Sequence, residues 1–377
     1  MLFYPVYAVL FADAGLSAAK ISSLFLLWSV TGFVVEVPSG LWADVFSRRL
    51  LLIVAPALTG AGYALWTFFP SYSFFALGFV LWGTGSSLRS GALQALVYDE
   101  LERAGAAGAY ARLIGRSQAA GMTAVMTATA LAAPVMHLGG FRAVGVASVA
   151  VTLLGVPVAW SFPESRGGGR HGGSHRDVLR EGLAEARGTP AVRRCLVIVA
   201  AVSGVDALEE YVPLLARATG AATATVPFLV LMVSAGMAAG GWLGGRGTRW
   251  AAPALAAGSV CLAAGGVIGR PAGLVPVAVA FGVFQWAIVA ADLRLQERIS
   301  DRSRATLTSM AGFGTEVVAV LTFAGYALGS SWMGPGPLFT LAAVPYAVIA
   351  LAMGADRAGS GTRRALGRMM RGPGKER

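Results

Sequence analysis

Charged residues are scarce in this sequence, and their scarcity excludes an ordinary soluble protein. Only 13% of the 377 residues are Asp, Glu, Lys or Arg, whereas a soluble domain carries about a quarter. Mean hydropathy is +0.66, so much of the outer surface must face an apolar medium. Cysteine is also rare. Cys195 and Cys261 form no metal-ligand pattern, and we interpret them as small apolar residues.

Motifs for nucleotide-driven or metal-dependent chemistry are absent as well. The sequence contains no Gly-x-x-x-x-Gly-Lys-Ser/Thr loop, so an ATP-driven pump would need a separate subunit. No hydrophobic run carries a His/Asp/Glu cluster, and the segments between the runs are too short for a catalytic domain. His171 and His175 have a metal-like spacing, but their Gly/Ser/Arg-rich surroundings favour a solvated linker. We therefore expect no enzyme activity, no cofactor and no metal site.

The sequence instead contains a series of hydrophobic runs separated by short charged or Gly/Pro-rich breaks. Each run has roughly 18–24 residues, and a helix of that length crosses the roughly 30 Å hydrocarbon core of a bilayer. The sequence therefore predicts an all-α polytopic membrane protein with twelve transmembrane helices. The expected spans are approximately residues 1–15, 19–42, 50–69, 73–98, 113–136, 142–161, 195–215, 225–244, 251–269, 272–291, 306–328 and 336–354.

The basic residues are distributed so unequally that they predict the orientation in the membrane. If the N-terminus is cytoplasmic, 25 of the 30 Lys and Arg residues fall inside, and only Lys20, Arg142, Arg217 and Arg270 fall outside. Because positively charged loops stay in the cytoplasm, both termini are expected there. This topology explains the net charge of +11 without a nucleic-acid partner. The excess of Arg over Lys, with abundant Ala and Gly, favours a bacterial source and hence the bacterial cytoplasmic membrane.

A charged, Gly-rich segment divides the chain into two groups of six spans. We expect an N-terminal six-helix bundle over residues 1–161, a cytoplasmic linker over 162–194, a C-terminal six-helix bundle over 195–354 and a basic cytoplasmic tail over 355–377. Each group has a short loop after its second span and a longer amphipathic loop after its fourth. Two such groups related by a parallel repeat favour a central site between two rocking halves.

The loop after the second span carries the most specific motif, Gly40-Leu41-Trp42-Ala43-Asp44-Val45-Phe46-Ser47-Arg48-Arg49. It resembles the signature loop of the major facilitator superfamily, in which a Gly, an Asp four residues later and a basic pair close the turn between helices 2 and 3. Val45 replaces a usual basic residue and Ser47 a usual glycine. Glu36-Val37-Pro38-Ser39 and Phe162-Pro163-Glu164 are also similar to that superfamily. The resemblance implies the major facilitator fold and a bacterial, drug- or metabolite-exporter-like transporter.

Two interpretations of this loop remain open. In the first it is a cytoplasmic gate, in which Gly40 permits close helix contact and Asp44 holds the two halves together until they rock. Asp44 then lies near a helix N-terminus or beside Arg48 and Arg49, and the family resemblance implies that its partner is the start of span 11, near residues 305–309. In the second interpretation Arg48 and Arg49 only mark the cytoplasmic side. Glu36 lies four residues before Gly40 on the same face, and it either contacts the other half or binds substrate. We favour the gate.

The seventh predicted span carries three carboxylates, Asp206, Glu209 and Glu210. Ionisable groups inside a membrane are costly unless they are paired or hydrated. Offsets of three and four place these residues on one helical face, and three adjacent carboxylates cannot all stay ionised in a low dielectric. The pattern is typical of a proton-coupling or cation-binding site. The alternative is an exposed helix end, because Pro213 follows closely.

Two other charged residues lie near the middle of predicted spans. Arg89 is expected to pair with an acid of span 7 or to bind an anionic substrate, because the family resemblance places spans 4 and 7 around one cavity. A purely structural ion pair is the alternative. Glu316, four residues after Gly312, favours substrate binding slightly over a contact between the halves.

Small and aromatic residues are the remaining candidates for a functional role. A ridge of glycines in span 8 (Gly236, Gly240 and Gly244) is interpreted as a sliding contact between the halves. Aromatic and amide side chains can either line the cavity or pack in the core, and the second is the commoner role in membrane spans. They are Tyr4, Tyr7, Trp28, Phe284, Gln285 and Trp286.

Together these features predict a secondary active transporter, a monomer that moves a small organic solute by alternating access and is coupled to protons. Efflux by antiport is the favoured direction. Proton-coupled uptake or facilitated diffusion is the first alternative, because span 5 offers only Ala132-Ala133-Pro134 where exporters of the superfamily often carry a Gly-Pro-rich motif. A membrane receptor or enzyme is a remote alternative.

Overall fold

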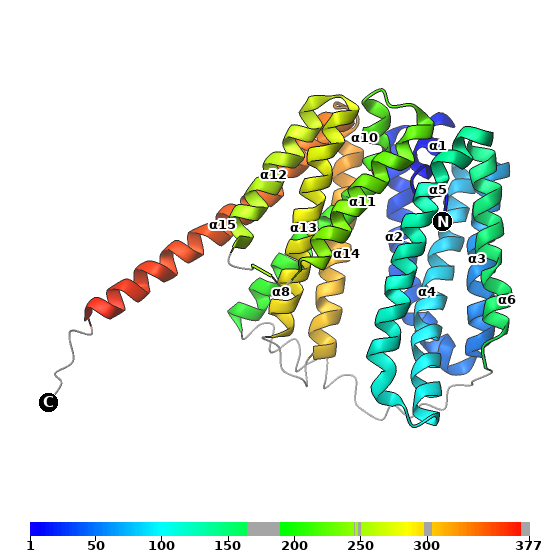
Figure 1. Cartoon of the computed structure of the whole chain (residues 1–377), viewed down its shortest axis with the longest axis horizontal. Coiled ribbons are helices and arrows are strands. Elements are labelled where there is room, and N and C mark those ends of the chain that lie inside the picture. The colour runs from blue at the N-terminus through cyan, green and yellow to red at the C-terminus, as the bar shows by residue number, and fades with distance from the viewer. Residues whose placement is uncertain (164–188, 245, 248–249, 298–303, 371–377) are drawn as a thin grey trace.

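The computed structural model describes residues 1–163, 189–244, 246–247, 250–297 and 304–370. Throughout these residues the regular structure is helical and no strand occurs, which confirms the predicted all-α class. Figure 1 shows two groups of helices side by side, one from each half of the chain. Most of the predicted linker, residues 164–188, and the end of the tail, residues 371–377, lie outside the described residues.

The N-terminal half runs from α1 to α6. Two of its helices begin with serine caps: Ser17 Oγ accepts a hydrogen bond from the Lys20 N–H (3.3 Å), and Ser47 Oγ accepts one from the Leu50 N–H (3.2 Å). The serine at position 47 therefore starts α3 where the family usually has a glycine. The helices are α1 (Tyr7–Asp13), α2 (Ala18–Val45), α3 (Arg48–Phe68), α4 (Tyr72–Arg103), α5 (Tyr110–Leu153) and α6 (Gly155–Trp160).

The helices of the C-terminal half begin at Pro190. Its first predicted span is divided into three short helices, whereas its other spans are long. The helices are α8 (Pro190–Val202), α9 (Gly204–Glu209), α10 (Val212–Ala218), α11 (Val226–Trp242), α12 (Ala251–Ile268), α13 (Leu274–Gln296), α14 (Arg304–Gly329) and α15 (Pro335–Met370). α15 continues past residue 354 and leaves the bundle at the lower left of Figure 1.

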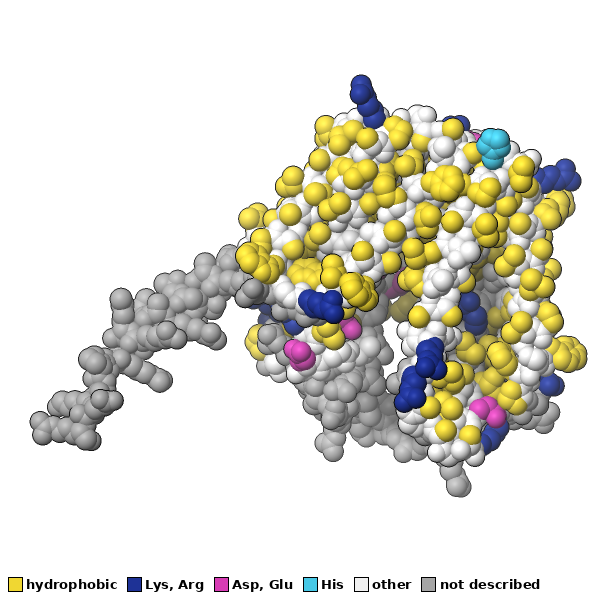
Figure 2. Space-filling model, viewed as in Figure 1, with side chains coloured by type: hydrophobic (Ala, Val, Ile, Leu, Met, Phe, Trp, Pro, Cys, Tyr) yellow, Lys and Arg dark blue, Asp and Glu magenta, His cyan; other side chains and the backbone are white. Residues whose placement is uncertain are grey.

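Within the described residues, eight helices are long and apolar enough to cross a membrane. Three predicted spans are not among them. α1 has only seven residues, span 7 is divided into α8, α9 and α10, and α4 has 32 residues but a polar middle around Arg89. Hydrophobic side chains cover the helix flanks on the face shown in Figure 2, as expected of a surface in lipid. The total of twelve membrane crossings stays a prediction.

One of the eight helices is too long for a single crossing. Arg112–Trp160 has 49 residues, or roughly 70 Å if straight, more than twice the hydrocarbon thickness. Gly140 interrupts it with φ 59° and ψ −157°, a conformation that is essentially restricted to glycine. This break lies between the predicted spans 113–136 and 142–161, so the chain reverses there.

The glycine ridge of α11 does not contact the other half, so that prediction was wrong. A Cβ at Gly236 or Gly240 would overlap the backbone of α13, at the carbonyl oxygens of Ala278 and Gly282. A Cβ at Gly282 would lie 2.7 Å from the Gly236 oxygen. The two backbones therefore touch inside the C-terminal half, because small residues allow close approach without side chains between the helices.

This contact predicts that Gly240→Ala destabilises the protein by about 1–3 kcal/mol, the usual cost of overpacking. Gly121→Ala in α5 is the matched control, since a Cβ there would meet no atom within 4 Å and alanine favours helix. Thermal unfolding of the purified variants in one detergent measures both. Equal melting temperatures for the two variants would contradict the close backbone contact.

Candidate functional site

The two halves meet along α2 and α14, and they are closed at one end only. On α2, Phe25 is fully buried but Phe33 is 48% exposed; on α14, Phe323 is 2% exposed but Phe313 is 55% exposed. Exposure thus rises along both helices away from the α1–α2 turn. Figure 2 shows a hollow between the halves at the opposite end, where α4 joins α5. A single stripe of α2 therefore closes one end of the molecule and lines the opening at the other.

Hydrogen bonds across this seam use two serines seven residues apart on α2. The Tyr211 hydroxyl, after α9, donates to Ser22 Oγ at 2.7 Å. Ser29 Oγ donates to the Glu316 carboxylate of α14. Glu316 therefore joins the two halves, which was the less favoured interpretation of this residue. Residues seven apart share one helical face, so this face of α2 contacts both the α9–α10 junction and α14 of the other half.

Glu210 makes the most enclosed of the cross-half contacts. Its carboxylate accepts a hydrogen bond from the Tyr7 hydroxyl of α1, and both side chains are buried. The Tyr7 ring is surrounded by other aromatic rings of the N-terminal half, with centroids 5.7–6.1 Å away. A carboxylate accepting a hydrogen bond in such dry surroundings gains more from it than in water.

The neighbouring carboxylates differ in their surroundings. Glu209 is half-buried, receives a hydrogen bond from Ser234 Oγ of α11 at 3.4 Å, and lies against the Tyr4 hydroxyl of the other half. Asp206 is exposed. Within the described residues, no group of three His, Cys, Asp or Glu side chains could hold a metal ion. The three acids therefore form a graded series, from the exposed Asp206 to the enclosed Glu210.

A break in the helix separates Glu210 from α10, while Asp206 and Glu209 both lie on α9. α9 ends at Glu209 and α10 starts at Val212, so Glu210 belongs to neither helix. Pro213 explains the break before α10, because it has no N–H group to donate to the Glu209 carbonyl four residues earlier, whereas proline is tolerated in the first turn of a helix. Asp206 and Glu209 share α9, three residues apart, and Glu210 directly follows the last residue of this helix. Discontinuous helices in transporters are found where substrate and coupling ions bind.

Arg89 does not join the acids. Its side chain is exposed and, within the described part of the chain, forms no ion pair. It lines a cavity of about 320 Å³ inside the N-terminal half, together with Trp82, Ser86 and Thr152. The expected pairing with span 7 is therefore absent in this conformation, and the guanidinium remains available to an anion.

The signature loop is only partly described. The backbones of Gly40 and Asp44 are helical, but the Asp44 side chain lies outside the described residues. Arg48 is 4% exposed; it pairs with Asp99 at the end of α4 and donates to the Ala95 carbonyl oxygen at 2.9 Å.

Both contacts of Arg48 hold α3 to α4 within one half. Arg49 lies beside it in the first turn of α3. Glu36 likewise stays within its half, accepting from Ser90 Oγ at 3.3 Å.

Sequence reasoning missed the serines and undervalued the tyrosines. Ser22 and Ser29 carry no charge, yet both lie on the α2 face that meets the other half. Tyr4 and Tyr7 were weighed as cavity residues, and their spacing of three already placed them on one face. The detectable signal was therefore a polar stripe on spans 1 and 2, but no spacing rule identifies its partners in spans 7 and 11.

Arg48→Gln is expected to destabilise the protein by about 2–4 kcal/mol, because it leaves Asp99 and a backbone carbonyl without their partner. Arg103→Gln is the control: its pair with Glu100 is 54% and 35% exposed, and exposed pairs contribute ~0–1 kcal/mol. Thermal unfolding compares them. An Arg48 variant as stable as the Arg103 variant would contradict a structural role for this buried pair.

Tyr7→Phe is expected to shift the closed end toward opening by roughly tenfold or more, since a hydrogen bond to a charged group contributes about 1.5–3 kcal/mol. Spin labels at Lys20→Cys and Arg217→Cys, both exposed near this end, would report a longer mean distance after Cys195 and Cys261 are replaced by Ala. Tyr72→Phe is the control, because its hydroxyl pairs with Ser23 inside one half at 3.1 Å. Unchanged distances in the Tyr7 variant would exclude this contact as a latch.

Comparison with known proteins identifies sequences and structures that are similar to this chain. Residues 1–322 match the Major Facilitator Superfamily. Solved structures with the same fold include the nucleoside transporter NupG (TM-score 0.71, 12% identity, 94% of each chain covered). They also include a bacterial homologue of the human lysosomal transporter Spinster in an inward-facing, unoccupied conformation (TM-score 0.64, 16% identity, 93% of this chain and 91% of that chain).

A third similar structure is an auto-inhibited POT family peptide transporter (TM-score 0.64, 15% identity, 94% of this chain and 93% of that chain). No curated protein sequence matches the chain. The structural neighbours support the fold alone, but the superfamily match covers most of the sequence and includes the signature loop. The chain therefore belongs to the Major Facilitator Superfamily and is a multi-pass membrane protein that transports small solutes.

Proposed function

We propose that the chain is a secondary active transporter whose halves, residues 1–161 and 195–354, rock against each other around a central site. The seam of α2 and α14 supports this, because it is buried at one end and exposed at the other. In the topology predicted from the basic residues, the closed end faces outward and the hollow faces the cytoplasm. The protein is then a monomer of the bacterial cytoplasmic membrane, caught with its inner side open.

The observation that carries proton coupling is the hydrogen bond from Tyr7 to the enclosed carboxylate of Glu210. A carboxylate without its proton is a strong acceptor, and a protonated one is a weaker acceptor. Protonation of Glu210 would thus weaken the contact that closes the outer end. Glu209, beside Tyr4 and Ser234, acts as a second member of the same coupling group.

Asp206 supplies the entry to this group. It is exposed, unlike Glu210, so water can deliver or remove a proton there. The exposed Arg89 in the cavity of the N-terminal half provides a cation for an acidic or polar group of the solute. Bound solute and bound proton then favour different conformations, which is the requirement for coupled transport.

Efflux by proton antiport remains the direction we propose, with proton-coupled uptake or facilitated diffusion as the alternative. The neighbours do not select among these, since their names refer to chemically different solutes such as nucleosides and peptides. Glu316 joins the halves through Ser29, so we assign it to closure of the seam. Gly40, Asp44 and Arg49 keep their proposed role at the inward gate.

Proton flux in liposomes tests the coupling. Purified protein is reconstituted with an internal pH dye, and cationic, neutral and anionic solutes are added one at a time. Addition of the transported solute should move protons, and Glu210→Gln and Glu209→Gln should reduce that movement at least tenfold because an amide cannot titrate. Asp206→Asn should reduce it less. The sign of the pH change separates antiport from symport.

Asp13→Asn is the matched control, because Asp13 is an exposed acid at the end of α1 and should leave the flux unchanged. If solute crosses without proton movement and the Glu210 and Glu209 variants behave like the parent, coupling through these acids is wrong. The chain would then be a facilitator, in which the acids hold structure.

A further inference from the structure

A groove lies on the flank of the C-terminal half, between α11, α12 and α13. Its volume is about 730 Å³, within the range of roughly 300–1,000 Å³ that small-molecule sites occupy. The described residues that line it all belong to this half, and two of them, Val275 and Val279, are 53% and 51% exposed. Figure 2 shows hydrophobic side chains over the face that these helices present, so the groove opens toward lipid.

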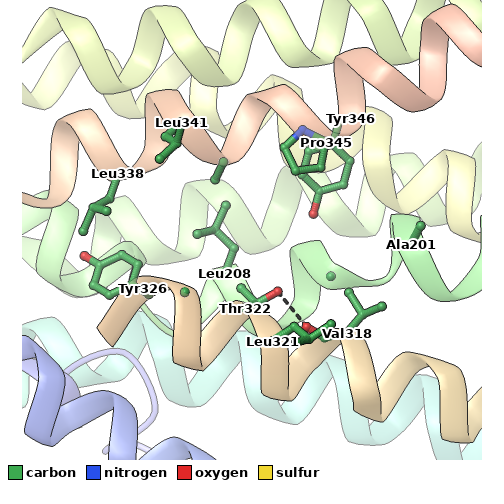
Figure 3. A pocket seen from close by; sticks show the side chains of 13 residues that line it. Ala201, Leu208, Val318, Leu321, Thr322, Tyr326, Leu338, Leu341, Pro345 and Tyr346 are labelled. Carbon is green, nitrogen blue, oxygen red and sulfur yellow. Dashed lines mark hydrogen bonds between the residues drawn. The ribbon is translucent and has the colours of Figure 1, made fainter. Parts of the chain in front are cut away.

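A second cavity in the same half has no charged group in its wall. It lies between α9, α14 and α15, has a volume of about 370 Å³, and is lined by apolar and aromatic residues with one threonine (Figure 3). Nothing in that wall favours one occupant over another. The groove of α11, α12 and α13 differs, because an arginine is among the residues that line it.

This arginine, Arg246, lies in the loop between α11 and α12. Its guanidinium lies over the Trp242 ring, 5.2 Å from the ring centroid, and its carbonyl oxygen accepts a hydrogen bond from Trp286 Nε1 of α13 at 3.0 Å. The side chain is exposed and, in the part of the chain that the structure describes, forms no ion pair. Residues 243–250 hold one further arginine and no acid. The loop is thus anchored to α13 and presents a positive charge at the end of the groove.

The groove has the depth of one leaflet. It follows α11 from Met232, near the middle of the helix, to Leu243, directly after its last residue. An interval of about 11 residues rises about 16 Å in a helix, and half of a hydrocarbon core of roughly 30 Å is about 15 Å. Trp242 and Trp250 at the loop end are 76% and 59% exposed, which is typical of tryptophan at the boundary between hydrocarbon and headgroups. The arginine therefore lies at headgroup level, above an apolar groove that a lipid chain can fill.

We propose that this groove binds an anionic glycerophospholipid from the leaflet at the α11–α12 loop. The Arg246 guanidinium pairs with the phosphate, and one acyl chain lies along the groove over the glycines where α11 meets α13. A zwitterionic lipid offers the same phosphate, but its ammonium group offsets part of the attraction. In the topology predicted from the basic residues this is the cytoplasmic leaflet, where basic pockets between helices recognise anionic headgroups.

Paired lipids that differ only in the headgroup test the assignment. The purified, delipidated full chain is titrated with phosphatidylglycerol and with phosphatidylcholine carrying the same acyl chains, and native mass spectrometry counts the retained lipid. The first phosphatidylglycerol should bind roughly 5-fold more tightly than the first phosphatidylcholine, the contribution of one arginine near a membrane surface. Arg246→Gln should lose this preference. Arg217→Gln, at an exposed arginine outside the groove, removes the same charge and should keep it.

A second pair of variants tests the groove itself. Ala239 of α11 lines the groove and is exposed, so Ala239→Phe places a ring in the groove without disturbing the core and should reduce retention of both lipids at least tenfold. Ala256→Phe, at an exposed alanine of α12 outside the groove, should retain them. Equal binding of the two lipids to the parent protein, or unchanged retention by Ala239→Phe, would overturn the proposal.

The same samples distinguish a lipid from other occupants. If a solute carried by the protein displaces the retained lipid one for one, the groove belongs to the transport pathway and the lipid assignment is wrong. If the parent protein forms a dimer that Ala239→Phe dissociates, a second copy of the chain covers the groove, and the assignment is again wrong. Retention of the lipid by a monomer in the presence of the solute supports the proposal. None of these results depends on whether transport is coupled to protons.

Discussion

The conformation of this protein depends on three polar contacts between its two halves, of which two are buried and one is part-buried. Tyr7 and Glu210, Tyr211 and Ser22, and Ser29 and Glu316 each join one half to the other. Around them the packing is aromatic and tight, and beyond them the same helices are exposed. Because each hydrogen bond can be exchanged for one with water once the end opens, two conformations can lie close in free energy. A purely apolar seam would lack this reversibility.

The break of span 7 determines how the carboxylates differ. Had it been one helix, offsets of three and four would have given the three acids similar surroundings. Instead, Glu210 lies between α9 and α10 and reaches Tyr7, while Asp206 remains exposed. The acids run from the exposed Asp206 to the buried Glu210. Along such a series a proton can pass between water and the hydrogen bond from Tyr7 to Glu210.

Sequence patterns predicted those parts of the structure that depend on local physics. Hydrophobic length predicted the helices, and the turn at Gly139–Gly140 falls between two predicted spans. The acids of span 7 were found because charge is costly in lipid. The partners were not found, because contacts such as Ser29 with Glu316 join residues 287 positions apart. The glycines of α11 were assigned to the wrong neighbour for the same reason: a smooth helix face does not specify which helix covers it.

The backbone contact between α11 and α13 also bears on where motion can occur. Where Gly240 meets Gly282, no side chain lies between the helices and none can change rotamer. A contact of this kind has little compliance, so α11 and α13 must move together as one stiff unit. Deformation then concentrates where the helical hydrogen-bond ladder is already broken, at Ser203 and Glu210. The short helices of span 7 would bear the strain of rocking. We therefore expect the fold to be most sensitive to mutation there.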